Sequence, residues 1–132
     1  MIRLQSNIEN TIYPLFVLEE RLKPGGDIIA ANWDYINEVV ELTIEDQGHH
    51  YVLRIPFYAV AGSLNYPGVT VRVDQPYILD YKGETRNGRG TDEGTSPAGS
   101  KFQSSVNLPD APELHLTGER IMRNIEQLLL PG

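Results

Sequence analysis

Few side chains in this chain have the types and spacing needed to bind a metal ion. His49 and His50 are adjacent, and Glu45 and Asp46 precede them across a short turn. Neighbouring side chains of a strand point to opposite faces, so one metal ion cannot readily take both imidazoles. The spacing also matches no zinc pattern, and hairpin turns are commonly polar for solvation alone. We therefore expect no metal site and no cofactor.

Asp34 is the carboxylate most suggestive of acid–base chemistry, because it stands between Trp33 and Tyr35. A general acid or base needs a shifted pKa in a cleft, however, and Asp is also favoured in turns for its local backbone hydrogen bonds. No serine lies in a Gly-x-Ser-x-Gly elbow, and the glycine-rich stretch 83–90 lacks the ending of a phosphate-binding loop. We name no catalytic residue, and a hydrolase or isomerase using Asp34 is only the third functional hypothesis.

Aromatic side chains are concentrated in the middle of the chain, where strands are predicted. Aromatics in strands usually pack in the core, but a tyrosine that lines a cavity can orient a small ligand through its hydroxyl. The candidate ligand site is a pocket between helices and sheet, lined by Trp33, Asp34, Tyr35 and Phe57. A small-ligand carrier or sensor is therefore the second functional hypothesis.

The elements that must position these residues include a series of strands with two-residue periodicity. Strands are expected at 27–33, 39–45, 51–57, 69–73 and 77–81, with a tight turn at 46–48 and another turn at Gln75-Pro76. Short connections between neighbouring strands require antiparallel pairing, so this region is predicted to be an antiparallel meander. Residues 2–4 alternate as well and are expected to form a short edge strand.

Two helices are predicted on either side of these strands. The first runs from about Tyr13 to Lys23, where Leu15, Leu18 and Leu22 share one face, and Glu19 pairs with Lys23. The second begins near Asp110, whose spacing to Glu113 matches a capping box. Its core stripe comprises Leu114, Ile121, Met122, Ile125, Leu128 and Leu129.

Two further features of the C-terminal third bear on the fold. Gly118 allows the second helix to approach the sheet closely, at a cost of roughly 1 kcal/mol in helix propensity. Residues 83–105 are rich in glycine and polar side chains and cannot bury much apolar area. We expect them to form a flexible loop within a single domain spanning residues 1–132.

Two helices and one sheet predict a two-layer α+β fold with both helices on one face of the sheet. The other face then carries Val39, Glu41, Val52, Arg54 and Arg72. A face that mixes apolar and oppositely charged side chains can pair with a copy of itself, although such faces are also ordinary solvent surface. The leading functional hypothesis is a non-catalytic binding or self-association module, because the sequence offers no nucleophile, metal set or cofactor loop, and a homodimer is one form that such a module can take.

Composition excludes several classes of function. The 132 residues contain 11 basic and 18 acidic side chains, a net charge of −7, which opposes contacts with nucleic acid or an anionic membrane surface. Cysteine is absent, so disulfides and thiolate chemistry are excluded. No apolar run approaches the ~20 residues that cross a bilayer, and the N-terminus lacks the apolar core of a signal peptide. A cytoplasmic location is expected.

Three short segments and the closing helix together resemble the YugN-like family of small bacterial proteins. The segments are Asn32-Trp33-Asp34-Tyr35, Leu53-Arg54-Ile55-Pro56-Phe57 and Pro67-Gly68-Val69-Thr70-Val71, and the helix covers 118–129. The resemblance implies a curved antiparallel sheet with two helices packed on it, in the order β-α-β4-α. It implies no activity, and no catalytic residue is carried over from it.

Overall fold

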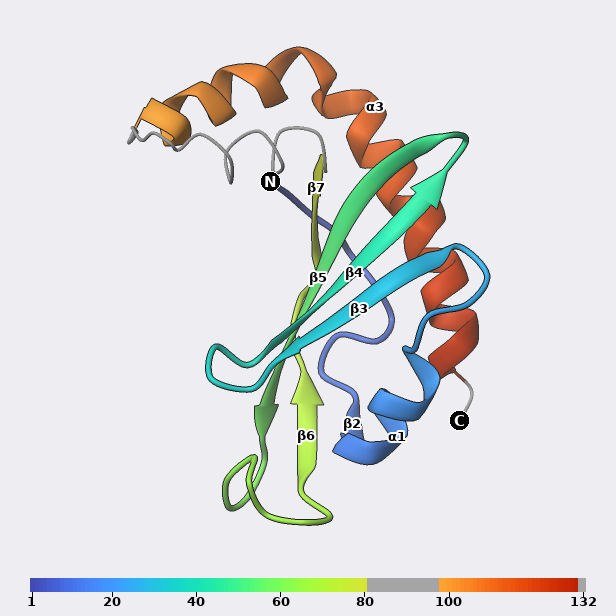
Figure 1. Cartoon of the computed structure of the whole chain (residues 1–132), viewed down its shortest axis with the longest axis vertical. Helices are drawn as coiled ribbons and strands as arrows, with labels where there is room; N and C mark the ends of the chain where they lie inside the picture. Colours follow the sequence, from blue (N-terminus) through green and yellow to red (C-terminus); the bar gives the residue numbers. More distant parts are fainter. Residues whose placement is uncertain (81–97, 131–132) are drawn as a thin grey trace.

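A strongly twisted antiparallel sheet with two helices makes up the structure (Figure 1). The computed structural model describes residues 1–80 and 98–130, and the side chains of 1–80 and 113–130. Its elements are β1 (Ile2–Arg3), β2 (Ile12–Pro14), α1 (Leu15–Arg21), β3 (Ile28–Asp34), β4 (Val39–Asp46), β5 (His49–Ala59), β6 (Thr70–Val73), β7 (Tyr77–Asp80) and α3 (Ala98–Leu129). The predicted α+β class is confirmed.

Strand β5 organises the sheet, because it pairs with β4 along one edge and with two short strands along the other. Its residues 51–54 pair with β7 and its residues 57–59 pair with β6. The predicted turn at Gln75-Pro76 is therefore wrong, since β6 and β7 are successive halves of one returning strand. The ladder breaks between them because Pro56 and Pro76 have no N–H to donate. The chain stays attached there through the Asp74 N–H, which donates to the Pro56 carbonyl at 2.9 Å.

The N-terminal segment follows the same returning strand and is broken in the same way. β1 pairs with β7, which confirms the predicted edge strand, and β2 pairs with β6. Counting each broken strand once, the chain order is strand, helix, four strands, helix. This is the order that the family resemblance implies.

Helix α1 is shorter than predicted. Residues 12–14 pair with β6 instead of extending the helix, and Ile12 is exposed. Pro14 explains the difference: it is the N-cap, with φ −60° and ψ 137°, and a proline disfavours helical geometry in the residue before it. The predicted Glu19–Lys23 pair is also replaced, since Lys23 contacts Glu20 at 3.4 Å.

Helix α3 begins at Ala98, so two predictions about this region are wrong. Residues 98–105 belong to the helix and not to a loop, and Asp110 lies within the helix and does not cap it. Positions 83–97 of the expected loop lie outside the described residues. The loop prediction rested on scarce apolar burial, whereas helical hydrogen bonds are local and can form without it. Figure 1 shows that α3 is bent, and Pro109 and Pro112 lie within it without an N–H for the helical ladder.

The core lies between the inner face of the sheet and the two helices. Val40, Leu42 and Ile44 of β4 join Leu15 and Leu18 of α1 in one buried cluster, as the strand periodicity predicts. The buried members from α3 are Leu114, Ile121, Met122, Ile125 and Leu129. Leu128 was predicted to belong to them but is 45% exposed, because Leu129 takes the inward position one turn after Ile125.

Gly118 lies where α3 crosses the sheet most closely, as predicted. A Cβ at this position would stand 2.7 Å from Leu4 Cδ2 and 3.2 Å from Ile78 Cγ2. Leu4 and Ile78 are both 0% exposed. The helix therefore rests on the sheet at a point where no larger residue fits without displacement.

Candidate functional site

Three of the four residues predicted to line a ligand pocket form one aromatic cluster. Trp33 stacks on Tyr35 with ring centres 6.3 Å apart, and Phe57 meets both rings at 5.6 and 6.5 Å. Phe57 is completely buried, whereas Tyr35 is 43% exposed. The cluster thus runs from the core to the surface, and the Tyr35 ring is the member that reaches solvent.

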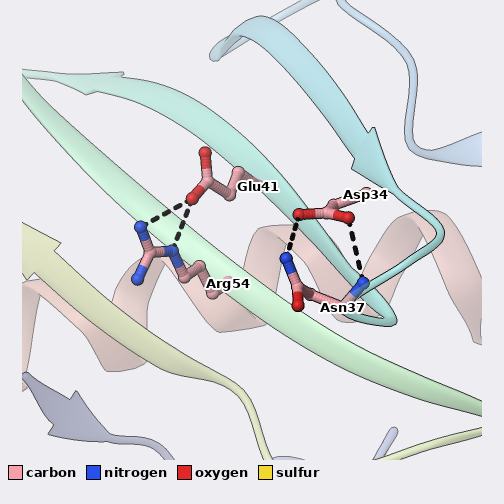
Figure 2. Close-up of polar contacts among 4 residues, drawn as sticks. All are labelled: Asp34, Asn37, Glu41 and Arg54. Atoms are coloured by element: carbon pink, nitrogen blue, oxygen red, sulfur yellow. Dashed lines mark hydrogen bonds and ion pairs between the residues drawn. The ribbon is translucent and has the colours of Figure 1, made fainter.

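Asp34, the fourth predicted residue, belongs to the turn between β3 and β4. Its Oδ1 accepts the Asn37 N–H at 3.0 Å, and its Oδ2 accepts the Asn37 side-chain amide at 2.8 Å (Figure 2). Asp34 Oδ1 also accepts the Ile36 N–H at 3.1 Å. Hydrogen bonds from the Asn37 backbone and then its side chain lower the pKa of Asp34. A carboxylate held ionised in this way shapes the turn and is poorly suited to accept a proton near neutral pH.

The Tyr35 hydroxyl makes a contact that connects the turn to helix α1. It donates a hydrogen bond to Glu19 Oε2 at 2.5 Å. Burial, followed by the hydrogen bond to Glu19 and the charge of that carboxylate, raises the pKa of Tyr35 to about 12. The hydroxyl is therefore a neutral donor at physiological pH.

A pocket of about 330 Å³ opens beside Tyr35, between α1 and the loop that joins β5 to β6. Its lining includes Phe16 and Glu19 from α1 and Tyr66 from the loop. Sequence reasoning missed Phe16 and placed Glu19 in a pair with Lys23. Phe16 and Glu19 both lie outside the buried Leu15–Leu18–Leu22 face of the helix. An aromatic residue at such a position is the signal that could have indicated a binding surface.

The five residues predicted to form an interface all lie on the sheet face opposite the core. Glu41 and Arg54 face each other across β4 and β5, and Arg54 Nε and Nη2 both donate to Glu41 Oε2 at 2.6 Å. The other Glu41 oxygen points away from Arg54, and α3 lies behind the strands, on the other side of the sheet (Figure 2). Arg54 also lies 6.0 Å from the centre of the Tyr77 ring. The centre of this face is thus a half-buried ion pair beside an aromatic ring.

The other predicted interface residues differ in their distance from this pair and in their exposure. Val39 pairs with Pro56 on one side of it, and Val52 pairs with Thr43 and Leu79 on the other. Val52 is only 4% exposed, so it offers little contact area to a partner. Arg72 is exposed but lies on β6 opposite Tyr58, apart from the Glu41–Arg54 row.

The histidines lie at the hairpin between β4 and β5. His49 pairs with Asp46 and His50 with Glu45 in the register, so the two imidazoles lie on opposite faces as expected. Among the described residues, no group of three His, Asp or Glu side chains is arranged to hold a metal ion. Within the same part of the chain, neither helix has the length and apolarity to cross a membrane.

Comparison with known proteins agrees with the sequence resemblance. The model of the YugN-like family matches residues 3–129. The chain is 34% identical over 113 residues to "Uncharacterized protein YugN" of Bacillus subtilis, covering 86% of this chain and 80% of that protein. No solved structure matches. Neither name states an activity, so a functional argument must start from the geometry.

Proposed function

This chain belongs to the YugN-like family, and we propose that it is a non-catalytic module that self-associates through the outer face of its sheet. The observation that carries the proposal is the half-buried Glu41–Arg54 pair at the centre of a face opposite both helices. The module acts in the cytoplasm, in keeping with a cysteine-free, acidic chain.

The arrangement of this face is self-complementary. Consider a two-fold axis that lies just outside this face, parallel to the strands and over the line midway between β4 and β5. Rotation about this axis puts β4 of each copy over β5 of the other. Glu41 of one copy then meets Arg54 of the other, and the Val39–Pro56 row meets the same row. Symmetric dimers use such surfaces, in which one patch contacts its own copy.

The outer face also has suitable chemistry for an interface. Apolar or aromatic residues, among them Val39, Pro56, Tyr77 and Leu79, flank the central ion pair. Charges that are already half-buried lose less hydration when a partner covers them than fully exposed charges do. Sheets packed face to face commonly keep their strands within about 30° of one another, which the twist of this sheet permits.

Charge reversal at the ion pair tests the proposal. Glu41→Arg places two guanidinium groups side by side and should weaken dimer formation at least tenfold in sedimentation equilibrium, because each copy then repels the other. The double variant Glu41→Arg/Arg54→Glu restores the pair in exchanged positions and should restore the dimer. Glu20→Arg, the same charge change on α1 at the opposite side of the sheet, serves as the matched control. A wild-type protein that sediments at 14.8 kDa at every concentration contradicts the proposal.

Ligand binding is the second candidate function, favoured by the pocket beside Tyr35. Its volume of about 330 Å³ falls within the range of small-molecule sites. Native mass spectrometry of gently purified protein should reveal a bound mass increment that Tyr66→Ala removes. An increment retained by that variant places the ligand elsewhere.

A further inference from the structure

Three aromatic side chains from separate segments meet at the pocket beside Tyr35. Phe16 is 63% exposed and Tyr66 is 66% exposed, and both line the pocket with Tyr35. Rings of this size ordinarily bury most of their surface, so three exposed rings around one hollow form an apolar patch that a ligand can cover.

The walls of the pocket are held in place before any ligand arrives. The loop that carries Tyr66 is closed by its own backbone, with the Tyr66 N–H donating to Ser63 at 3.0 Å and the Val69 N–H donating to Tyr66 at 3.1 Å. The Leu15 N–H donates to the Val69 carbonyl at 2.8 Å, which ties this loop to the start of α1. A preformed site binds without the entropy cost of ordering its walls.

The charge of the pocket is negative. Of the described residues that line it, Glu19 alone carries a charge. Its Oε2 accepts the hydrogen bond from the Tyr35 hydroxyl. Its Oε1 can contact a bound cation or accept a hydrogen bond from it. An anionic ligand would be repelled here. A carboxylate among several aromatic rings is instead the environment that attracts organic cations.

We propose that this pocket binds a small organic ammonium ion, held between Phe16, Tyr35 and Tyr66 with its charge next to Glu19. The inference rests on the ligand-binding candidate above and names the chemical class of its ligand. A quaternary or bulky ammonium suits the site best, since aromatic faces replace its weak hydration more readily than that of a compact ammonium.

A titration with choline tests the proposal. Trp33 is the single tryptophan and its ring stacks on Tyr35 at 6.3 Å, so its fluorescence reports on the pocket wall. Choline should change this fluorescence in a saturable way at constant ionic strength. The uncharged analogue 3,3-dimethylbutan-1-ol, which has the same shape, should bind at least about tenfold more weakly.

Variants identify the groups responsible. Glu19→Gln keeps an acceptor for Tyr35 but removes the charge, and should weaken choline binding about tenfold. Tyr66→Ala removes an exposed ring with little effect on folding and should weaken it by a similar factor. Glu20→Gln, the same change at the next position of α1, should leave it unchanged because Glu20 pairs with Lys23 at the surface and is not among the described residues that line the pocket.

Each other outcome overturns the proposal in a recognisable way. Equal binding of choline and its uncharged analogue shows a ligand pocket without ammonium chemistry, which leaves the ligand-binding candidate intact. Equal weakening by Glu19→Gln and Glu20→Gln shows a diffuse surface effect and not a site. No saturable response with choline, together with no bound mass in native spectra, removes both the ammonium proposal and the ligand-binding candidate.

Discussion

Gly118→Ala should destabilise the protein, although alanine is the better helix former. In an exposed helix this change stabilises by about 1 kcal/mol. Here the added Cβ would lie 2.7 Å from Leu4 Cδ2, a distance that real Cβ atoms essentially never show, and 3.2 Å from Ile78 Cγ2, which is tighter than most Cβ contacts. Neither neighbour can move into open space, since both side chains are 0% exposed.

The expected magnitude follows from two opposing terms. Inserting a methyl group into a filled core costs about 1–3 kcal/mol. Subtracting the gain in helix propensity leaves a net loss of about 1 kcal/mol in the free energy of unfolding. For a chain of this length, that loss corresponds to a fall of roughly 3–5 °C in Tm.

A double-mutant cycle isolates the contact with Leu4. Leu4→Ala alone should cost about 2–5 kcal/mol, because it leaves a cavity in the core. In that background Gly118→Ala should become stabilising, giving a coupling free energy of about 2 kcal/mol in urea unfolding. Leu116→Ala, at a 64% exposed position of the same helix, should show no coupling to Leu4→Ala.

One result would refute this reasoning. If Gly118→Ala stabilises the wild-type protein by the full helix-propensity gain and shows no coupling to Leu4→Ala, then α3 does not rest on the sheet at this point. The close approach of α3 to Leu4 and Ile78 would then be wrong.

Two further predictions concern titrating groups. The phenol of Tyr35 should ionise near pH 12 in an ultraviolet difference titration, and Glu19→Gln should bring its pKa closer to the ordinary value of 10.0. Because the folded pKa is raised, the stability that Tyr35 contributes is complete below pH 10 and is lost as pH rises through 12, so Tyr35→Phe should flatten the alkaline limb of the unfolding profile. The pKa shift of Asp34 has the opposite sign, because its pKa is lowered in the folded state. Its contribution to stability is therefore present above the unfolded pKa of 3.8 and is lost as pH falls through the folded pKa. Asp34→Asn should therefore reduce the fall of Tm as the pH drops below the unfolded value of 3.8, and an unchanged acid limb would contradict the assigned hydrogen bonds.

The strand predictions succeeded where periodicity and turn chemistry agree. Val40, Leu42 and Ile44 alternate with polar residues, and the turn at 46–48 has positive φ at Gln47 and Gly48, as a tight hairpin requires. The break at Asp74 to Pro76 was interpreted as a reversal because proline usually marks a turn. Whether a proline interrupts a strand or reverses it depends on the strand beside it, which the local sequence does not contain.

The candidate site was only partly predictable for a similar reason. Trp33, Tyr35 and Phe57 come together because β3 and β5, which flank β4, carry them to the same side of the sheet, and alternation can anticipate that. Glu19 and Tyr66 reach Tyr35 from a helix and a loop whose positions depend on how the whole core packs. Spacing along the chain therefore gave no indication that Glu19 and Tyr66 line a pocket with Tyr35.

The N-terminal segment has a consequence for how the protein is made. Residues 2–14 lie against β6 and β7, and their side chains also reach α3: Ser6 donates to Glu126 at 2.7 Å, and the Tyr13 hydroxyl donates to the Leu129 carbonyl at 3.2 Å. Residues 2–14 are thus synthesised long before their partners, because β6 and β7 lie in the middle of the sequence and the partners in α3 follow 116 to 120 residues later. Such long separations between contacting residues slow folding. The N-terminal strands stay unpaired in the nascent chain until β6 and β7 have been made, and the contacts of this segment with α3 form later still.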